Sequence, residues 1–139
     1  MSVLRFAISS NASGLSQYAT LIASILRRTS SEVHVRCWCS DASPESFVQG
    51  RLRVEFLAAA KVIEGSYPSH VSEAVFYRLN AIKECDDWDQ CLVMDYDQLV
   101  FCDLAELFEI DLGSHLIAGR LHGDGVNMNY AMETWLKQP

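Results

Sequence analysis

Two aspartates, Asp95 and Asp97, stand one residue apart in the stretch CLVMDYDQLVF, residues 91–101. An apolar run leads directly into them, and apolar residues resume after them. Two carboxylates this close repel one another, and burying them without a partner is costly. A divalent cation resolves the conflict, and hard carboxylate oxygens suit Mg²⁺ or Mn²⁺. We therefore take Asp95 and Asp97 as candidate metal ligands.

The same pair also has a simpler interpretation. An Asp-x-Asp tripeptide is frequent by chance, and two acids at a strand end can cap a turn or lie in solvent. The metal interpretation makes a sharper prediction about chemistry. A cation held by one or two carboxylates completes its coordination shell with water and phosphate oxygens, so the substrate is expected to carry a diphosphate.

The elements that must position this pair begin with a strand–helix–strand unit. A short apolar strand is predicted over 3–8, a helix with an apolar face over 15–28, and a strand of period two over 32–39. The polar stretch between the first strand and the helix, SSNASG, reads as a turn over 9–14. A unit of this size is typical of a parallel crossover.

The rest of the chain continues the alternation. Further strands are expected at 53–57, 91–95 and 115–121. A helix is expected to start in 42–50, with Ser43 as its cap and Pro44 in its first turn. Two further helices are expected over 72–84 and 129–138, and a short helix or turn over 103–111. We therefore predict a three-layer α/β sandwich with a mostly parallel sheet, built as one domain over 1–139. In such sheets ligands bind beyond the carboxyl ends of the strands, where Asp95 and Asp97 fall after a strand expected to lie mid-sheet.

Composition limits the partners and the compartment. The net charge of −7, from 18 acidic and 11 basic residues, disfavours nucleic acid and anionic membranes, which bind through basic surfaces. No apolar run is long enough to span a bilayer, and the N-terminus lacks the features of a signal peptide. The five cysteines do not follow a zinc or redox spacing, and Cys37 and Cys39 should share one face of their strand as buried thiols. These features predict a cytoplasmic protein.

The stretch from Ser72 to Gly119 resembles family 8 glycosyltransferases, the group that includes glycogenin and bacterial lipopolysaccharide hexosyltransferases. The matching residues occur in the family's order and are Arg78-Leu79, Val93-Met94-Asp95-Tyr96-Asp97, Leu99-Val100, Asp103-Leu104 and Glu106-Leu107-Phe108. The resemblance implies a GT-A fold, a retaining hexosyltransferase, a nucleotide-sugar donor such as UDP-hexose, and Mn²⁺ (or Mg²⁺) as cofactor. The acceptor is not indicated.

Residue by residue, the resemblance implies that Asp97 is the principal metal ligand and that Asp95 shares the metal and approaches the donor ribose. Tyr96 lies between them and is expected to pack or to contact the donor. Arg78 is expected near the donor sugar as the catalytic cation. Its place beside the helix stripe of Val71, Val75, Leu79 and Ile82 independently predicts a partly buried guanidinium that needs an anionic partner. The alternative is an arginine whose head reaches solvent or pairs with a structural acid.

The sequence departs from the family in three places. The loop after the first strand lacks the family's aromatic residue, although Ser9, Ser10 and Asn11 can still hydrogen-bond a base or ribose. After the 115–121 strand the chain reads RLHGDGV, with Arg120, His122 and Asp124, and Gly125-Val126 matches the family only loosely. The family's later segment, which supplies a histidine ligand, is not matched. His122 is the nearest spare imidazole, and the third ligand stays unassigned.

Two other functions compete with the transferase. A nucleotide-sugar-binding relic or assembly module would keep the fold without turnover, and the short core favours a homodimer in any case. A phosphohydrolase of the haloacid dehalogenase type also ends a strand in Asp-x-Asp. Such enzymes usually place the pair near the N-terminus and follow it with Gly-Thr or Thr, whereas here Gln98-Leu99 follows and the pair lies two-thirds along the chain.

Overall fold

The computed structural model describes residues 2–40, 44–60, 74–115 and 118–119. By its internal contacts the chain divides into two units, residues 1–109 and residues 110–139. All the helices and strands described below belong to the first unit.

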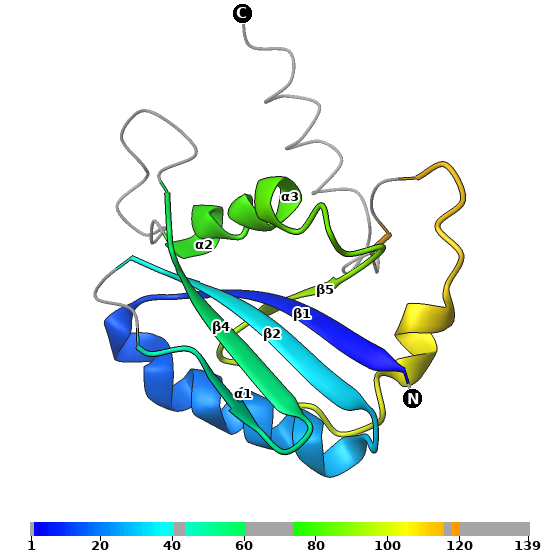
Figure 1. The fold of residues 1–139 in the computed structure, drawn as a ribbon, viewed down its shortest axis with the longest axis horizontal. Helices are drawn as coiled ribbons and strands as arrows, with labels where there is room; N and C mark the ends of the chain where they lie inside the picture. Colours follow the sequence, from blue (N-terminus) through cyan, green and yellow to red (C-terminus); the bar gives the residue numbers. More distant parts are fainter. Residues whose placement is uncertain (1, 41–43, 61–73, 116–117, 120–139) are drawn as a thin grey trace, which may run out of the picture. The chain divides into compact units, whose positions relative to one another are not determined.

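The first unit is built around a five-stranded sheet in the order β3-β4-β2-β1-β5 (Figure 1). The strands are β1 (Val3–Ser10), β2 (Glu32–Cys39), β3 (Phe47–Gln49), β4 (Leu52–Ala58) and β5 (Leu92–Asp95). Four of them run parallel, and β3 alone pairs antiparallel, with β4. The predicted mostly parallel sheet is confirmed.

The strand–helix–strand unit also forms as predicted. Helix α1 (Leu15–Arg28) connects β1 to the parallel strand β2. Its apolar positions recur at helical spacing, and Tyr18, Leu21, Ile22 and Ile25 are buried. Arg27 and Arg28 occupy its last turn, where a positive charge is favoured by the helix dipole.

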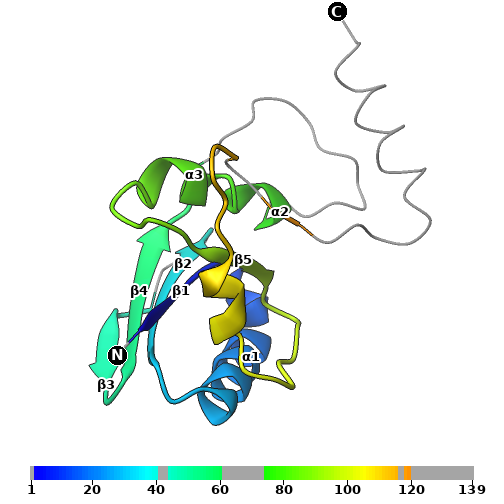
Figure 2. The same cartoon turned by 90° about the vertical axis from the view of Figure 1, so that its right-hand side faces the viewer.

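Alternation along β1 and β2 divides the core between the two faces of the sheet. Phe6, Ile8, Val35 and Cys37 belong to the cluster that packs on α1. Residues of the opposite face, Ala7 and Trp38 among them, form a second cluster with α2 (Ala74–Tyr77), α3 (Asn80–Glu84) and the turn after it. Figure 2 shows α1 and the pair α2–α3 on different sides of the sheet. The three-layer α/β architecture is therefore confirmed.

The helix predicted to start in 42–50 is not formed where the structure describes that stretch. Pro44–Ser46 has no regular structure, and Phe47–Gln49 is strand β3, paired with β4 through a tight turn at Gly50. Gly50 has a φ of 57°, which glycine adopts without strain and which allows the chain to reverse. The hairpin therefore overrides the Ser-Pro helix signal, and Ser43 itself lies outside the described residues.

The helix predicted over 72–84 is broken into α2 and α3 by a turn at Arg78 and Leu79. Asn80, only 1% exposed, explains the break. Its side-chain amide donates hydrogen bonds to the carbonyl oxygens of Tyr77 at 2.8 Å and Ala60 at 3.2 Å. Where burial is described in this stretch, Tyr77, Ala81 and Cys85 are buried and Leu79 of the predicted stripe is partly buried. Ser72, Glu73 and Val71 lie outside the described residues.

Strand β5 lies at the end of the sheet, because within the described residues it pairs only with β1. The predicted mid-sheet position is therefore wrong for this part of the chain. The strand expected over 115–121 is absent at its described residues, His115, Ala118 and Gly119. The short helix predicted within 103–111 is confirmed as a 3-10 helix, Ala105–Glu109, whereas the helix expected over 129–138 lies outside the described residues.

Candidate functional site

The carboxyl ends of β1 and β5 bring the sequence-predicted residues together. The two strands are parallel neighbours, and Ser9 stands directly beside Asp95 in their register. Ser9 and Ser10 were expected in a loop, but both belong to β1 and both are buried. The 3-10 turn Ala12–Gly14 and the start of α1 follow at the same edge of the sheet.

Asp95 forms an ion pair with Arg78. The Nη2 of Arg78 donates a hydrogen bond to Oδ1 of Asp95. The side chains are 47% and 35% exposed, so water reaches both. Arg78 lies in the turn between α2 and α3, and the break at Asn80 sets the course of the chain at that turn. The sequence predicted an anionic partner for this half-buried guanidinium, and Asp95, an acid of the candidate site, is one.

Asp97 lies two residues after the ion pair, in the turn that ends β5. Its side chain is exposed, and no hydrogen bond or ion pair joins it to the residues that the structure describes. Asp95 and Asp97 thus differ in their surroundings, since one carboxylate is neutralised by Arg78 and the other faces water. An incoming cation would meet Asp97 without first displacing a described partner.

Tyr96, between the two acids, packs against the core. It is partly buried against the core cluster that includes α1. The ring lies so close to Gly14 that a Cβ on that glycine would come within 2.8 Å of Tyr96 Cε2. Tyr96 therefore fixes the Asp-Tyr-Asp turn to the start of α1.

The hydrogen bonds of the β1–α1 turn are satisfied within the turn. The Ser10 hydroxyl donates to the carbonyl oxygen of Asn11 at 2.9 Å. The Asn11 side-chain oxygen accepts from the Ser13 hydroxyl at 2.8 Å and from the Gly14 amide at 3.0 Å. These contacts give the turn a fixed shape, and the role of Ser9, Ser10 and Asn11 in holding a base or ribose stays a prediction.

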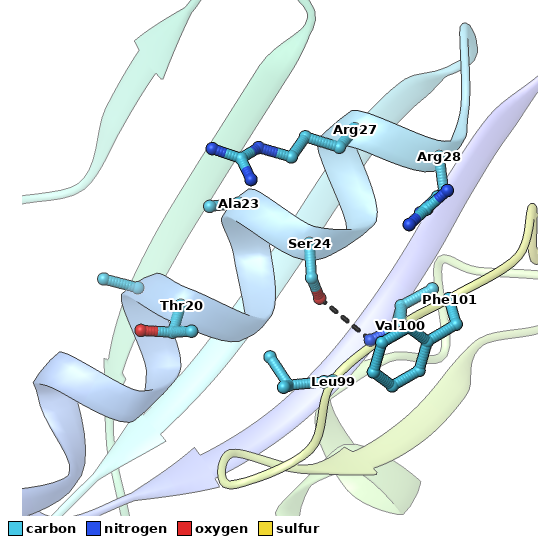
Figure 3. A pocket seen from close by; sticks show the side chains of 9 residues that line it. Thr20, Ala23, Ser24, Arg27, Arg28, Leu99, Val100 and Phe101 are labelled. Atoms are coloured by element: carbon cyan, nitrogen blue, oxygen red, sulfur yellow. Dashed lines mark hydrogen bonds between the residues drawn. The ribbon is translucent and has the colours of Figure 1, made fainter.

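The chain that follows the acidic pair is attached to α1. The Val100 amide donates to the Ser24 hydroxyl at 3.0 Å (Figure 3). That hydroxyl donates in turn to the Leu21 carbonyl at 2.7 Å. A surface hollow of about 470 Å³ lies between α1 and this segment. Its described lining is Ala19, Thr20, Ala23, Ser24, Arg27, Arg28, Leu99, Val100 and Phe101. None of the predicted site residues lines it.

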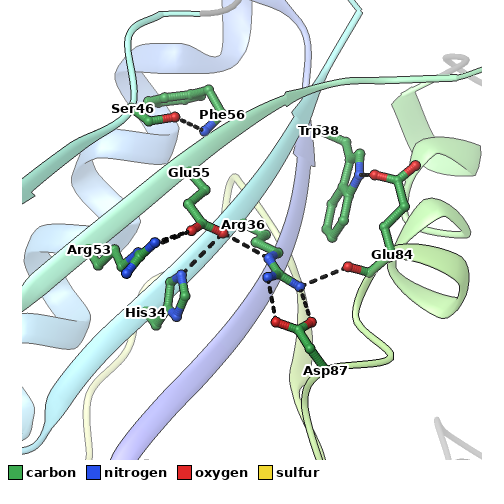
Figure 4. Close-up of polar contacts among 9 residues, drawn as sticks. All are labelled: His34, Arg36, Trp38, Ser46, Arg53, Glu55, Phe56, Glu84 and Asp87. Carbon is green, nitrogen blue, oxygen red and sulfur yellow. Dashed lines mark hydrogen bonds and ion pairs between the residues drawn. The ribbon is translucent and has the colours of Figure 1, made fainter.

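A polar network lies on the face of β2 that points away from α1 (Figure 4). It was not predicted from the sequence. The Arg36 guanidinium donates to both carboxylate oxygens of Asp87, at 2.6 and 2.8 Å, and its Nε donates to Glu55 at 2.8 Å. It also donates to the Glu84 carbonyl at 2.8 Å. The network ties the turn that leads into β5 to the centre of the sheet. The alternation of His34, Arg36 and Trp38 with apolar residues was its one visible signal.

The network shifts the ionisation of its members. The hydrogen bond from Arg36 is the main cause that lowers the pKa of Asp87 below its ordinary value. Burial raises the pKa of Glu55, but the hydrogen bonds from Arg36 and Arg53 outweigh it, and the net pKa is lowered. His34 Nε2 lies 3.3 Å from Glu55 without forming a hydrogen bond, and burial lowers the pKa of His34.

The described residues do not contain a complete protein cage for a metal ion. Among them, no three His, Cys, Asp or Glu side chains gather closely enough to hold one. Arg120, His122, Asp124 and the Gly125-Val126 pair lie outside the described residues. Within the described part of the chain, no helix is long and apolar enough to cross a membrane.

A mostly parallel sheet, covered by helices on both faces and carrying acids at its carboxyl edge, is consistent with a GT-A-like fold. Comparison with known proteins supports this class. The structure is similar to that of WbbM, a bifunctional glycosyltransferase solved in its apo form, with a TM-score of 0.58 and 18% sequence identity. The match covers 81% of this chain and 22% of that one, so this chain spans less than a quarter of its neighbour's length. No protein-family model matches the sequence, and no curated protein matches it. The predicted fold is confirmed, and membership of family 8 stays a prediction.

Proposed function

We propose that the protein is a metal-dependent glycosyltransferase that moves a hexose from a nucleotide-sugar donor, UDP-hexose by preference, to an acceptor. The observation that carries this proposal is the place of Asp95, Asp97 and Arg78. Arg78 pairs with Asp95 at the end of β5, and Asp97 follows two residues later, at the edge where open α/β sheets bind their ligands, in a glycosyltransferase-like fold.

Under this proposal Asp97 is the principal metal ligand, because its exposed carboxylate has no partner among the described residues. Asp95 contributes through the carboxylate oxygen that Arg78 does not engage. These hard oxygen donors fit Mn²⁺ or Mg²⁺ in number and kind if water and phosphate oxygens supply the remaining positions. When bound, the ion supplies neutralisation of the diphosphate and of the charge that develops on it.

The protein's own contribution is electrostatic. The guanidinium of Arg78 lies at the acidic pair, half-exposed, where it is able to leave Asp95 for an anionic oxygen of the departing nucleoside diphosphate. A cation placed where negative charge develops stabilises the transition state more than the ground state. Retention at the anomeric carbon is the outcome implied by the family resemblance, and we name no nucleophile.

Metal-dependent nucleotide binding is the first test of this proposal. We expect UDP to raise the melting temperature in the presence of Mn²⁺ but not with the chelator EDTA, because a ligand that binds only the folded state stabilises it. Asp97→Ala should abolish the Mn²⁺-dependent shift. Asp89→Ala removes an exposed acid in the turn before β5 and serves as the matched control, with the shift retained. If UDP gives no shift that depends on metal, the proposal fails.

Turnover separates the enzyme from the alternative of a binding relic. A transferase should hydrolyse UDP-hexose slowly without an acceptor, and Asp97→Ala should remove that activity. A relic would show the Mn²⁺-dependent shift while donor hydrolysis stays at the background rate. The enzyme and the relic therefore differ in the rate of donor hydrolysis, which is measured on the same protein.

A further inference from the structure

The hollow of about 470 Å³ between α1 and residues 99–101, which we call the α1 hollow, has the size of a ligand site (Figure 3). Sites for small molecules commonly have volumes of about 300–1,000 Å³. The helix side of its lining runs from Ala19 to Arg28, which spans about 14 Å at the helical rise of about 1.5 Å per residue. The hollow is therefore long enough for a chain-like ligand that lies along the helix.

The two sides of the α1 hollow are joined to each other. The Val100 amide donates to the Ser24 hydroxyl at 3.0 Å, and the Val100 side chain is buried in the core cluster that packs on α1. The segment 99–101 is thereby attached to the helix at its middle residue. A site whose walls are already fixed loses less conformational entropy when a ligand binds.

The side chains before and after Val100 are apolar and exposed. Leu99 is 55% exposed, and Phe101, at 74%, is the most exposed large apolar side chain of the described residues. On the helix side, Ala19 and Ala23 are exposed and small, so they leave space beside these two side chains. An apolar chain bound here would remove this surface from water, which is favourable.

Two cations line the same hollow. Arg27 and Arg28 are exposed, and neither forms a hydrogen bond or an ion pair with the residues that the structure describes. By contrast, Arg36, Arg53 and Arg78 each pair with a carboxylate. The helix dipole accounts for two cations in the last turn of α1, but it does not require them to line a hollow. The α1 hollow thus combines apolar walls with two guanidinium groups that are available to an anion.

We propose that the α1 hollow binds a single-chain amphiphile with an anionic head, a phosphate or a carboxylate. The apolar chain lies along Ala23, Leu99 and Phe101. The head is bound at the end of the helix by Arg27 and Arg28, because guanidinium groups pair well with phosphate and carboxylate oxygens. This inference does not depend on the glycosyltransferase proposal, since none of the residues proposed for metal binding or catalysis lines the hollow.

Charge and size favour this occupant over a larger one. The net charge of −7 opposes the approach of the whole protein to an anionic bilayer, and a second copy of the chain would carry the same repelling charge. A stable protein partner also contacts about 20–30 residues on each side of an interface, whereas nine residues line the hollow. A small amphiphile satisfies the two cations without either difficulty.

Isothermal titration calorimetry with decyl phosphate, at concentrations at which it is monomeric, tests the proposal. We expect one binding site per chain. Decyltrimethylammonium has the same chain with the opposite charge, and inorganic phosphate has the head without the chain. Each should bind at least about tenfold more weakly, because it lacks one of the two interactions. The absence of decyl phosphate binding, or equal binding of either control compound, would overturn the proposal.

Nuclear magnetic resonance and variants locate the ligand. Decyl phosphate should shift the amide signals of Val100 and Phe101. Phe101→Ala, and the double change Arg27→Gln with Arg28→Gln, should each weaken binding about tenfold. Ala23→Trp should block binding, because the larger side chain would fill the hollow from an exposed position on the helix. Binding that survives all of these changes would place the ligand elsewhere and contradict the proposal.

Matched controls separate the site from general surface effects. Lys83→Gln removes an exposed cation from α3, and Val48→Ala removes an exposed apolar side chain from β3. Neither residue lines the hollow, so both variants should bind decyl phosphate as the wild type does. Binding only to vesicles of anionic phospholipid would identify a membrane surface instead. A dimer in sedimentation velocity that Phe101→Ala dissociates would identify a second copy as the occupant, and either result would overturn the proposal.

Discussion

Tyr96 covers Gly14: a Cβ on the glycine would lie 2.8 Å from Cε2 of the ring and 2.6 Å from the Ser10 hydroxyl oxygen. The residue between the two aspartates is thereby held against the first residues of the β1–α1 connection. Tyr96 thereby connects the acidic turn to the start of α1.

Gly14→Ala should lower the free energy of unfolding by about 1–3 kcal/mol, because the added methyl group would clash with the Ser10 hydroxyl and the Tyr96 ring. Gly14 has a φ of −86°, which alanine adopts freely, so without that contact the change would stabilise the fold by reducing the freedom of the unfolded chain. Urea unfolding measures the difference. Gly119→Ala is the control and should be nearly neutral, because no atom of the described residues lies within 4 Å of the added one. A more stable Gly14→Ala protein would contradict the close packing of Tyr96.

Arg78→Met should separate stability from activity. The ion pair with Asp95 is water-exposed, so its loss should change the free energy of unfolding by no more than about 1 kcal/mol. Donor hydrolysis should fall by a factor on the order of 10²–10³, because a cation at the developing charge is removed. The matched control is Lys83→Met, which removes an exposed cation from α3 and should leave both quantities unchanged. Full hydrolysis by Arg78→Met would exclude Arg78 from the chemistry.

The sequence predicted the elements whose signals are local and repeated. The spacing of Tyr18, Leu21 and Ile25 is enough to define α1, and the alternation in β2 is enough to define a strand, because each pattern is the direct result of one face being buried. The aspartates were found for a similar reason, since acids placed directly behind an apolar strand are conspicuous.

Features that depend on tertiary contacts were missed. Asn80 resembles an ordinary helix residue until its amide is seen to bond the carbonyls of Tyr77 and Ala60, which lie on different segments. The sequence pattern likewise predicts a solvated strand residue at Arg36. Its ion-pair partner Asp87 lies 51 positions away along the chain, so nothing near Arg36 in the sequence indicates the pair. The place of β5 at the end of the described sheet was also missed, because pairing between strands far apart in sequence leaves no local signal.

Asn80→Asp tests the break between α2 and α3. The change keeps the size of the side chain but replaces its N–H donors with an oxygen that faces two carbonyl oxygens. We expect a loss of about 2–4 kcal/mol in the free energy of unfolding at neutral pH, because a buried group loses its partners and gains charge. Chemical denaturation provides the measurement. Gln17→Glu makes the same amide-to-acid change on the exposed side of α1 and should cost little. A neutral Asn80→Asp would show that the amide does not hold the turn.

His34 should make the stability of the protein depend on pH in the mildly acidic range. Its pKa in the fold lies below its ordinary value of 6.5, mainly because the ring is buried and secondarily because of Arg53 and Arg36, against the opposing effect of Glu55. The unfolded chain therefore binds the proton more tightly than the folded chain. The stabilisation is complete above pH 6.5 and is lost as the pH falls through the folded pKa, with a slope of up to about 1.4 kcal/mol per pH unit.

His34→Gln should remove that slope while His115→Gln, a change at an exposed histidine, should retain it. The measurement is urea unfolding from pH 7.5 downward, compared among the three proteins. Below about pH 4.5 a second loss should remain in all of them, because Glu55 and Asp87 have lowered pKa values and are needed in the ionised form. If the free energy of unfolding of the wild type and of His34→Gln depended on pH identically above about pH 4.5, the buried ring would be protonated as easily in the folded protein as in the unfolded chain.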